Sequence, residues 1–256
     1  MISVRDLTIE YTTATVGEKI RVLENIRMEI PKGGTCAVLG ASGCGKSTLL
    51  KAMAGILTGF SGKILMDGEA VNPVQQKIGF IPQNYGLLPW KTVEDNITVA
   101  CRIKNKRAPE KEKLEKIIQL LGLSGLEQRY PKELSGGQQQ RVGLARIFLL
   151  EPDVLLMDEP FSALDAITRE EMQEVFLAVW RKYAVSTVLV THYVEEAIYM
   201  GQQIAVFSSN PGRVFKMLDN PLFGRTDLRY SKAFFEMGRD LRALLKQEVP
   251  ENAQRV

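Results

Sequence analysis

The chain has 256 residues, 45% of them hydrophobic and 25% charged, with a formal net charge of +3 at pH 7. These values lie near the average for soluble globular proteins, and no window holds about eighteen uninterrupted apolar residues, which excludes a bilayer-spanning segment. The three cysteines lack the spacing of a disulfide framework or a metal site and favour a reducing compartment. The N-terminus lacks the charged start and apolar run of a signal peptide.

The first elements are predicted to form an antiparallel β edge. Apolar residues alternate in residues 2–10 and again in residues 21–30, which is typical of half-buried strands. Thr35–Leu39 is a short apolar strand. A glycine-rich loop follows this strand and opens a helix that we predict over Lys46–Leu57.

Two short strands and then a helical region are predicted next. The strands are expected at Lys63–Met66 and Lys77–Pro82, with a turn at Asp67 and Gly68 between them. Residues 93–133 then have a helical pattern that places apolar side chains on one face and charged side chains on the other, and we predict a separate helical lobe there. The elements predicted beyond this lobe are a helix over Gln138–Leu150, a strand over Val154–Met157, a helix with apolar positions from Met172 to Tyr183, a strand over Thr187–Thr191 and a C-terminal helix containing Phe234, Met237, Leu241 and Leu244. Strands that alternate with helices indicate a parallel sheet covered on both faces, so we predict an α/β fold.

The glycine-rich loop has the composition of a phosphate-binding element. Its residues are Gly40, Ala41, Ser42, Gly43, Cys44, Gly45, Lys46, Ser47 and Thr48. Gly43 and Gly45 allow backbone N–H groups to close around phosphates, Lys46 brings positive charge to the β- and γ-phosphates, and Ser47 offers a hydroxyl to Mg²⁺. We therefore predict ATP and Mg²⁺ as cofactors. Cys44 is interpreted as a small spacer, although an exposed thiol at this helix start would be reactive.

A second phosphate-binding element lies at residues 134–138, where Leu134 precedes Ser135, Gly136, Gly137 and Gln138. One nucleotide does not need two such elements from the same chain. Two copies arranged head to tail would let each supply the half-site that the other lacks. We therefore expect a homodimer with ATP between the two copies.

Polar residues follow several predicted strands, at the edge where the carboxyl ends of parallel strands meet. Asp158 is expected to hold Mg²⁺ through water, and Glu159 is expected to orient or deprotonate the attacking water. His192, the single histidine, is expected to contact the γ-phosphate, and Gln83 is expected to reach the metal or the water. Tyr11, at the end of the first strand, is a candidate platform for adenine. Its alternative role is that of an aromatic side chain filling the β edge.

Together these motifs resemble the ATP-binding subunit of an ATP-binding cassette (ABC) transporter along nearly the whole chain. The resemblance identifies residues 40–48 as the Walker A motif, Gln83 as the Q-loop, residues 134–138 as the signature, residues 154–159 as the Walker B motif with Glu159 as catalytic base, Ser162 to Asp165 as the D-loop and His192 as the switch histidine. As part of the D-loop, Asp165 is also expected to contact nucleotide. The resemblance implies a P-loop NTPase core with an N-terminal antiparallel β subdomain and a helical subdomain inserted at about residues 93–150. It assigns residues 1–220 to the cassette and residues 221–256 to a short helical tail.

The stretch 83–93 and the tail after residues 211–213 resemble the subfamily that serves nitrate, sulfonate and taurine importers. In this family the segment after the Q-loop receives a short helix of the membrane subunit, so Leu87, Leu88 and Trp90 are expected to contact a permease. The alternative is that these side chains pack the helical lobe onto the core. The resemblance implies a peripheral protein on the cytoplasmic face of the membrane, with a substrate-binding protein acting indirectly and no nucleic-acid partner.

Other functions stay open at this point. A soluble cassette ATPase acting on ribosomes or DNA usually carries two cassettes or a long coiled coil, whereas the segment between residues 48 and 134 predicts only a small helical lobe. A small-molecule kinase would leave residues 134–138 without a role. Export instead of import is also compatible with the motifs, as is import of a different substrate such as a vitamin precursor.

Overall fold

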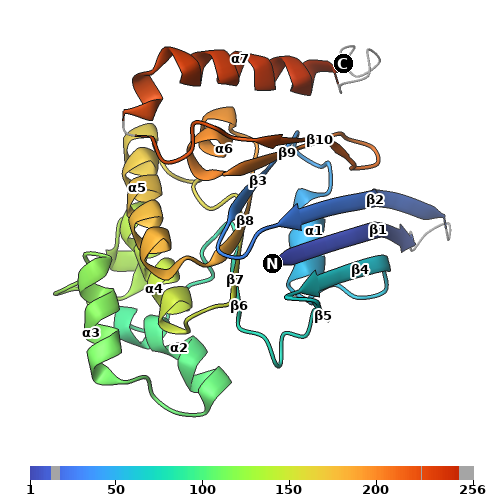
Figure 1. The fold of residues 1–256 in the computed structure, drawn as a ribbon. Helices are drawn as coiled ribbons and strands as arrows, with labels where there is room; N and C mark the ends of the chain where they lie inside the picture. Colours follow the sequence, from blue (N-terminus) through green and yellow to red (C-terminus); the bar gives the residue numbers. More distant parts are fainter. Residues whose placement is uncertain (13–17, 226, 248–256) are drawn as a thin grey trace. The chain divides into compact units, whose positions relative to one another are not determined.

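A computed structural model describes residues 1–12, 18–225 and 227–247 of the chain (Figure 1). It divides into two compact units. The first unit comprises Met1–Pro73 and Ser186–Val256, and the second comprises Val74–Val185.

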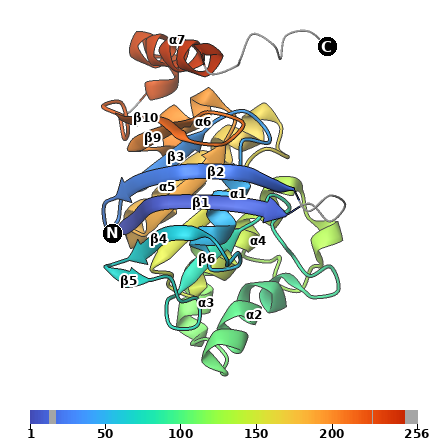
Figure 2. The same ribbon diagram turned by 90° about the vertical axis from the view of Figure 1, so that its right-hand side faces the viewer.

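The first unit begins with an antiparallel sheet. Its strands are β1 (Ile2–Thr12), β2 (Lys19–Ile30), β4 (Ser61–Met66) and β5 (Glu69–Ala70), in the order β2-β1-β4-β5. Figure 2 shows β1 and β2 side by side along their length. The predicted alternation shifts phase between Val4 and Leu7 because the register shifts there and Asp6 adopts a φ of +51°. The predicted antiparallel β edge is confirmed, and β5 is an addition to it.

The first unit also contains a mainly parallel set of strands. They are β3 (Thr35–Leu39), β8 (Ser186–Thr191), β9 (Gln203–Phe207) and β10 (Val214–Asp219), in the order β10-β9-β3-β8. Every residue of β3 and β8 is buried, as expected where both faces of a parallel sheet are covered. The sequence analysis did not anticipate β9 and β10. The antiparallel pairing of β10 with β9 gives the sheet a mixed edge.

The described part of the first unit contains three helices, α1 (Lys46–Met53), α6 (Val194–Met200) and α7 (Lys232–Gln247), together with a 3-10 turn at Leu228–Tyr230. The prediction that α1 extends to Leu57 is wrong. The helix ends at Met53 because Gly55 takes a φ of +68°, and a Cβ at Gly55 would lie 2.8 Å from Pro73 Cδ. The apolar stripe of α7 packs on α6, with Phe234 and Leu241 buried.

The second unit holds two parallel strands and four α-helices. The strands are β6 (Ile78–Ile81) and β7 (Val154–Asp158), and the helices are α2 (Val93–Asn105), α3 (Lys111–Leu120), α4 (Gly136–Leu149) and α5 (Ala166–Tyr183), with a 3-10 turn at Pro131–Glu133. The helical character predicted for residues 93–133 is confirmed, and its apolar face is buried at Ile117, Leu121 and Leu123.

Across the ranges 1–12, 18–225 and 227–247, none of the helices combines the length and apolar character needed to cross a bilayer. The boundaries predicted at residues 93–150 and 221–256 stay predictions. The last nine residues of the predicted tail, 248–256, lie outside the described residues.

Candidate functional site

The glycine-rich loop of the first unit follows β3 and leads directly into α1. Gly43 and Gly45 have φ values of +81° and +91°, in the left-handed region that glycine adopts without a steric cost. A Cβ at Gly45 would lie 2.6 Å from Cδ2 of Leu23 on β2, whereas a Cβ at Gly43 would meet no atom within 4 Å. Gly45 therefore allows the loop to pack against β2, and the side of the loop at Gly43 is open to a ligand.

The N-terminus of α1 is prepared for an anion. Its N-cap, Gly45, provides no side-chain acceptor, and the first turn of α1 contains no acidic residue, so the exposed N–H groups keep their partial positive charge. Lys46 is only 4% exposed, and its Nζ donates hydrogen bonds to Gly40 O at 2.9 Å and to Ala41 O at 2.7 Å. The loop thus concentrates N–H donors and one buried cation, which fits a phosphate group.

Cys44 is buried inside this loop. Burial raises the pKa of its thiol above the ordinary value, although the nearby Lys46 ammonium acts in the opposite direction. A Cβ at Gly40 would lie 2.9 Å from the Cys44 sulfur, so the thiol fills the space beneath the loop. The structure favours the spacer role and not the reactive-thiol alternative.

His192 lies at the same sheet edge as the glycine-rich loop. In the parallel pair β3–β8, Leu39 is opposite Thr191. Gly40 and His192 are therefore the first residues after the carboxyl ends of two adjacent strands. The imidazole is exposed and packs against the Tyr193 ring at 4.1 Å between centroids. The turn is held because Tyr193 N donates to Thr191 Oγ1 at 3.0 Å.

Tyr11 lies on β1 opposite Ile20 of β2. The same strand β2 carries Val22 and Leu23, the residues against which Gly45 packs. The Tyr11 side chain is 42% exposed, so it does not fill the β edge as the alternative interpretation required. An exposed ring on this sheet has a face available for stacking on a base.

In the second unit, β6 and β7 bring Gln83, Asp158 and Glu159 to one sheet edge. Ile81 is opposite Met157, so these polar residues follow the paired ends of two parallel strands. Gln83 Nε2 donates to Ser162 Oγ at 3.3 Å, and this hydroxyl donates to Glu159 O at 2.9 Å. Glu159 turns away from the strand with a φ of +46°, and its side chain is half-buried. Hydrogen bonds therefore link the amide of Gln83 to the backbone of Glu159.

Residues 135–138 form the N-terminus of α4. Ser135 is the N-cap, and it forms a capping box in which Ser135 Oγ accepts from Gln138 N at 3.3 Å while Gln138 Oε1 accepts from Ser135 N at 3.0 Å. Gly136 is exposed, and a Cβ at Gly137 would lie 2.9 Å from Thr168 Cγ2. The second phosphate-binding element is thus a helix start whose first two residues lack side chains.

Asp165 has a structural role that the sequence analysis did not identify. It is the N-cap of α5 and accepts a hydrogen bond from Thr168 N at 3.0 Å. Hydrogen bonds that Asp165 accepts from Thr168, chiefly from its side chain and next from its backbone N–H, lower the pKa of Asp165 below its ordinary value. An aspartate three residues before a threonine at a helix start was the available signal.

Two further residues without any local sequence signal are Asn96 and Arg146. Their side chains hold the loop that follows Gln83, and Arg146 Nε donates to Asn96 O at 2.8 Å across 50 positions of the chain. Partners this far apart cannot be paired by motif spacing.

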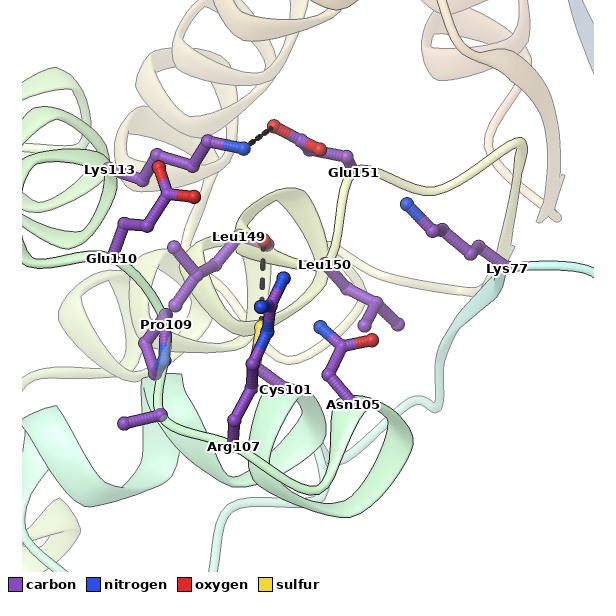
Figure 3. Close-up of a pocket in the computed structure, with 11 residues that line it drawn as sticks. Lys77, Cys101, Asn105, Arg107, Pro109, Glu110, Lys113, Leu149, Leu150 and Glu151 are labelled. Atoms are coloured by element: carbon purple, nitrogen blue, oxygen red, sulfur yellow. Dashed lines mark hydrogen bonds and ion pairs between the residues drawn. The ribbon is translucent and has the colours of Figure 1, made fainter.

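A cavity in the second unit lies away from these residues, with a volume of about 530 Å³ (Figure 3). Its walls come from the C-terminal ends of α2 and α4 and from the start of α3, so it lies at the opposite end of α4 from Ser135. Its cations are Lys77, Arg107 and Lys113. Lys113 Nζ pairs with Glu151 at 2.8 Å. Helix C-termini carry partial negative charge, which accounts for cations gathering here, and the cavity contains none of the motif residues.

Comparisons with known proteins agree with this arrangement. The sequence model of the ABC transporter family matches residues 23–162. The chain is 46% identical over 203 residues to the aliphatic sulfonates import ATP-binding protein SsuB of Bacillus cereus, covering 79% of this chain and 80% of that protein. It is 40% identical over 243 residues to the taurine import ATP-binding protein TauB of Rhizobium johnstonii, covering 92% and 93%.

A solved structure has the same fold. The ATP-binding cassette MJ0796, determined as a dimer in a post-hydrolysis state bound to ADP and Pi, superposes with a TM-score of 0.74 at 27% identity. The superposition covers 86% of this chain and 98% of the cassette. With the family model spanning more than half of the chain and the motifs on the predicted strands and helix starts, this chain belongs to the ABC transporter family and is an ATPase of the cassette type.

Proposed function

We propose that this chain powers the import of a small sulfonate, with taurine and aliphatic sulfonates as the favoured substrates. The observation that carries the proposal is the 40% identity to a taurine import ATP-binding protein, because the match covers 92% of this chain. The 46% identity to an aliphatic sulfonates import ATP-binding protein supports the same substrate class.

In the proposed reaction each residue has one task toward ATP. The N–H groups of residues 40–48 and the Lys46 ammonium bind the phosphates, the Tyr11 ring stacks on adenine, and His192 contacts the γ-phosphate. Glu159 accepts a proton from the attacking water.

Mg²⁺ is the proposed metal, with Ser47, Gln83 and Asp158 as its protein ligands. Among the described residues no three His, Cys, Asp or Glu side chains form a metal cluster. This fits Mg²⁺ in nucleotide sites, which is bound by one or two protein carboxylates together with phosphates and water, and Asp158 is the carboxylate among the three proposed residues. When bound, the ion neutralises charge on the β- and γ-phosphates.

We propose that the working form is a homodimer in which residues 135–138 and Asp165 of one copy contact the nucleotide of the other. The support is that α4 begins with exposed Ser135 and Gly136, so its N-terminus is accessible to a phosphate from outside the chain. The solved cassette with a TM-score of 0.74 is a dimer.

A permease is the proposed membrane partner, and it would contact the loop that follows Gln83. Trp90 is 71% exposed, while Leu87 and Leu88 are half-buried. An exposed tryptophan beside two partly buried leucines is typical of an interface anchor. Through this contact the chain would lie on the cytoplasmic face of the membrane, and a substrate-binding protein would reach it only through the permease.

Replacing Glu159 with glutamine tests the ATPase assignment. The Glu159→Gln variant should bind ATP normally, lose about 100-fold or more in turnover because an amide cannot accept the proton, and accumulate an ATP-bound dimer. Phosphate release and size-exclusion chromatography with ATP measure these effects. Glu171→Gln, an exposed site on α5, makes the same change of charge and should behave as wild type. Normal turnover of Glu159→Gln would contradict the role of Glu159.

Growth of cells on a sulfonate tests the substrate. A strain that lacks this chain should fail to grow with taurine or an alkanesulfonate as sole sulfur source. The wild-type chain should restore growth and the Glu159→Gln variant should not. Undiminished sulfonate uptake in the deleted strain would overturn the proposed substrate class.

A further inference from the structure

The side-chain amide of Asn96 holds the second half of the loop Gln83–Thr92 through several hydrogen bonds. Asn96, on the first turns of α2, is 0% exposed. Its Oδ1 accepts from Leu88 N at 2.8 Å, and its Nδ2 lies 3.0 Å from Leu88 O, 2.9 Å from Lys91 O and 3.0 Å from Thr92 O. Every polar atom of the Asn96 side chain is therefore used to fix the backbone of the loop.

Arg146 connects this loop to α4. Its Nη1 donates to Gly86 O at 2.7 Å, its Nη2 donates to Asn96 Oδ1 at 2.7 Å, and its Nε donates to Asn96 O at 2.8 Å. All three nitrogens thus bind neutral acceptors, and within the fully described second unit Arg146 forms no ion pair. Desolvation makes a partly buried cation with no anionic partner costly, and the three hydrogen bonds offset part of this cost while fixing the guanidinium against the loop.

The loop also touches α4 one turn earlier. A Cβ at Gly143 would lie 3.6 Å from Tyr85 Cβ and 3.7 Å from Tyr85 O, so the loop backbone approaches the helix closely at this point. Tyr85 is buried with a φ of +59°. Loop and helix therefore meet at two successive turns of α4, at Gly143 and at Arg146.

Within the second unit, which is described in full, two buried polar side chains at this contact lack hydrogen-bond partners. They are the hydroxyl of Tyr85 and the amide of Gln140, which is three residues before Gly143 on α4. Unsatisfied buried polar groups are costly. Tyr85 is on the loop and Gln140 is on α4, so neither side chain contributes a hydrogen bond across the contact, and the Arg146 and Asn96 bonds hold the two sides together.

We propose that Arg146, acting through Asn96, is a positioning residue that couples α4 to the permease-facing loop Gln83–Thr92. Because α4 starts at Ser135, which contacts nucleotide in the proposed dimer, movement of this helix start is passed through Arg146 to Leu87, Leu88 and Trp90. The inference rests on the proposed function for the direction of coupling.

The test compares Arg146→Lys with wild type in two settings. Lysine keeps the charge but cannot bind three acceptors at once. For the isolated chain, ATP binding and basal ATPase should stay within about twofold of wild type, while hydrogen exchange of the loop amides, Leu88 N–H above all, should become faster. For the chain reconstituted with its permease, stimulation of ATPase and sulfonate uptake should fall at least about fivefold, the lower end of allosteric coupling.

Arg141→Lys is the matched control. Arg141 lies on the same helix and is half-buried, but it contacts Leu121 O at 3.4 Å and the Met172 sulfur and makes no bond to the loop. It should keep wild-type stimulation. If Arg146→Lys fails to fold, Asn96→Asp serves in its place, because it offers Arg146 a carboxylate while removing the donor to the loop carbonyls.

Four outcomes separate the possibilities. Faster loop exchange with full permease stimulation would overturn the coupling role, as would an equal loss of basal and stimulated ATPase. A selective loss of stimulation would support it. A wild-type transporter without ATP-dependent uptake would reveal failure of the proposed function before any variant is compared, and it would remove the coupling proposal as well.

Discussion

The two proposed phosphate-binding elements of this chain both lie at helix starts, and they are built differently. At α1 the N-cap is Gly45, without a side-chain acceptor, and the buried Lys46 ammonium lies beside it. At α4 the N-cap is Ser135, whose capping box with Gln138 already satisfies one N–H of the helix and one of the loop.

The difference indicates two kinds of binding. The α1 start offers open N–H groups and a full positive charge, so it can hold phosphate by itself. The α4 start contains no cation, and its serine is engaged locally, so it suits a second contact made after nucleotide has bound elsewhere. Substitutions at three helix starts test this comparison.

Removing the cation from the α1 start should have the largest effect. Lys46→Ala deletes the one full charge of the loop, so we expect ATPase activity to fall by about 100-fold or more, together with loss of nucleotide binding. Binding of a fluorescent ATP analogue and phosphate release measure the two losses. Lys51→Ala removes a lysine from the exposed face of the same helix and should keep both activities. Tight nucleotide binding by Lys46→Ala would show that the N–H groups suffice.

Removing the cap of α4 should have an intermediate effect. Ser135→Ala should lower the free energy of unfolding by about 1 kcal/mol, or about 2–4 °C in Tm. It should also lower ATPase activity while nucleotide binding to the monomer persists.

Ser135→Asn separates the two consequences, because asparagine is an equally good N-cap without the hydroxyl. Restored stability with low ATPase would assign the hydroxyl to nucleotide contact. Recovery of both would reduce Ser135 to a helix cap and contradict the proposed second half-site.

A third helix start, that of α5, should give the smallest effect, and this effect depends on pH. The pKa of Asp165 is lowered in the folded state by hydrogen bonds from Thr168. Because the pKa is lower in the folded state, the ionised cap stabilises the fold at pH values above the ordinary aspartate pKa of about 3.9. This stabilisation is lost as the pH falls through the pKa of the folded state.

The Tm of Asp165→Ala should therefore lie below that of wild type at neutral pH, and the gap should close in acid. Thermal unfolding across pH measures it. Asp165→Asn, which caps without a charge, should show less of this pH dependence. A gap that stays constant with pH would exclude the carboxylate charge as its source.

Much of the site was predictable because its motifs are local. The order of strand, glycine-rich loop and helix around Lys46, the glycine positions with positive φ and the polar residues at strand ends all follow from short stretches of sequence. The end of α1 was mispredicted because the helical pattern continues to Leu57, whereas the contact of Gly55 with Pro73 favours an earlier stop. Strand β9 was missed because the apolar run that follows Gln203 in this five-residue strand is too short to have a periodicity that separates strand from helix.

By itself the sequence determined where the candidate residues for phosphate, metal and water lie relative to strand ends and helix starts, because glycine conformations and helix starts depend on near neighbours in the chain. Only the tertiary structure decided which of them are linked. The hydrogen bond from Gln83 to Ser162 spans 79 positions, and the bonds from Arg146 to Asn96 span 50. Such partners meet only after strands and helices have packed, since hydrogen bonds act over about 3 Å of space and not over distance along the chain.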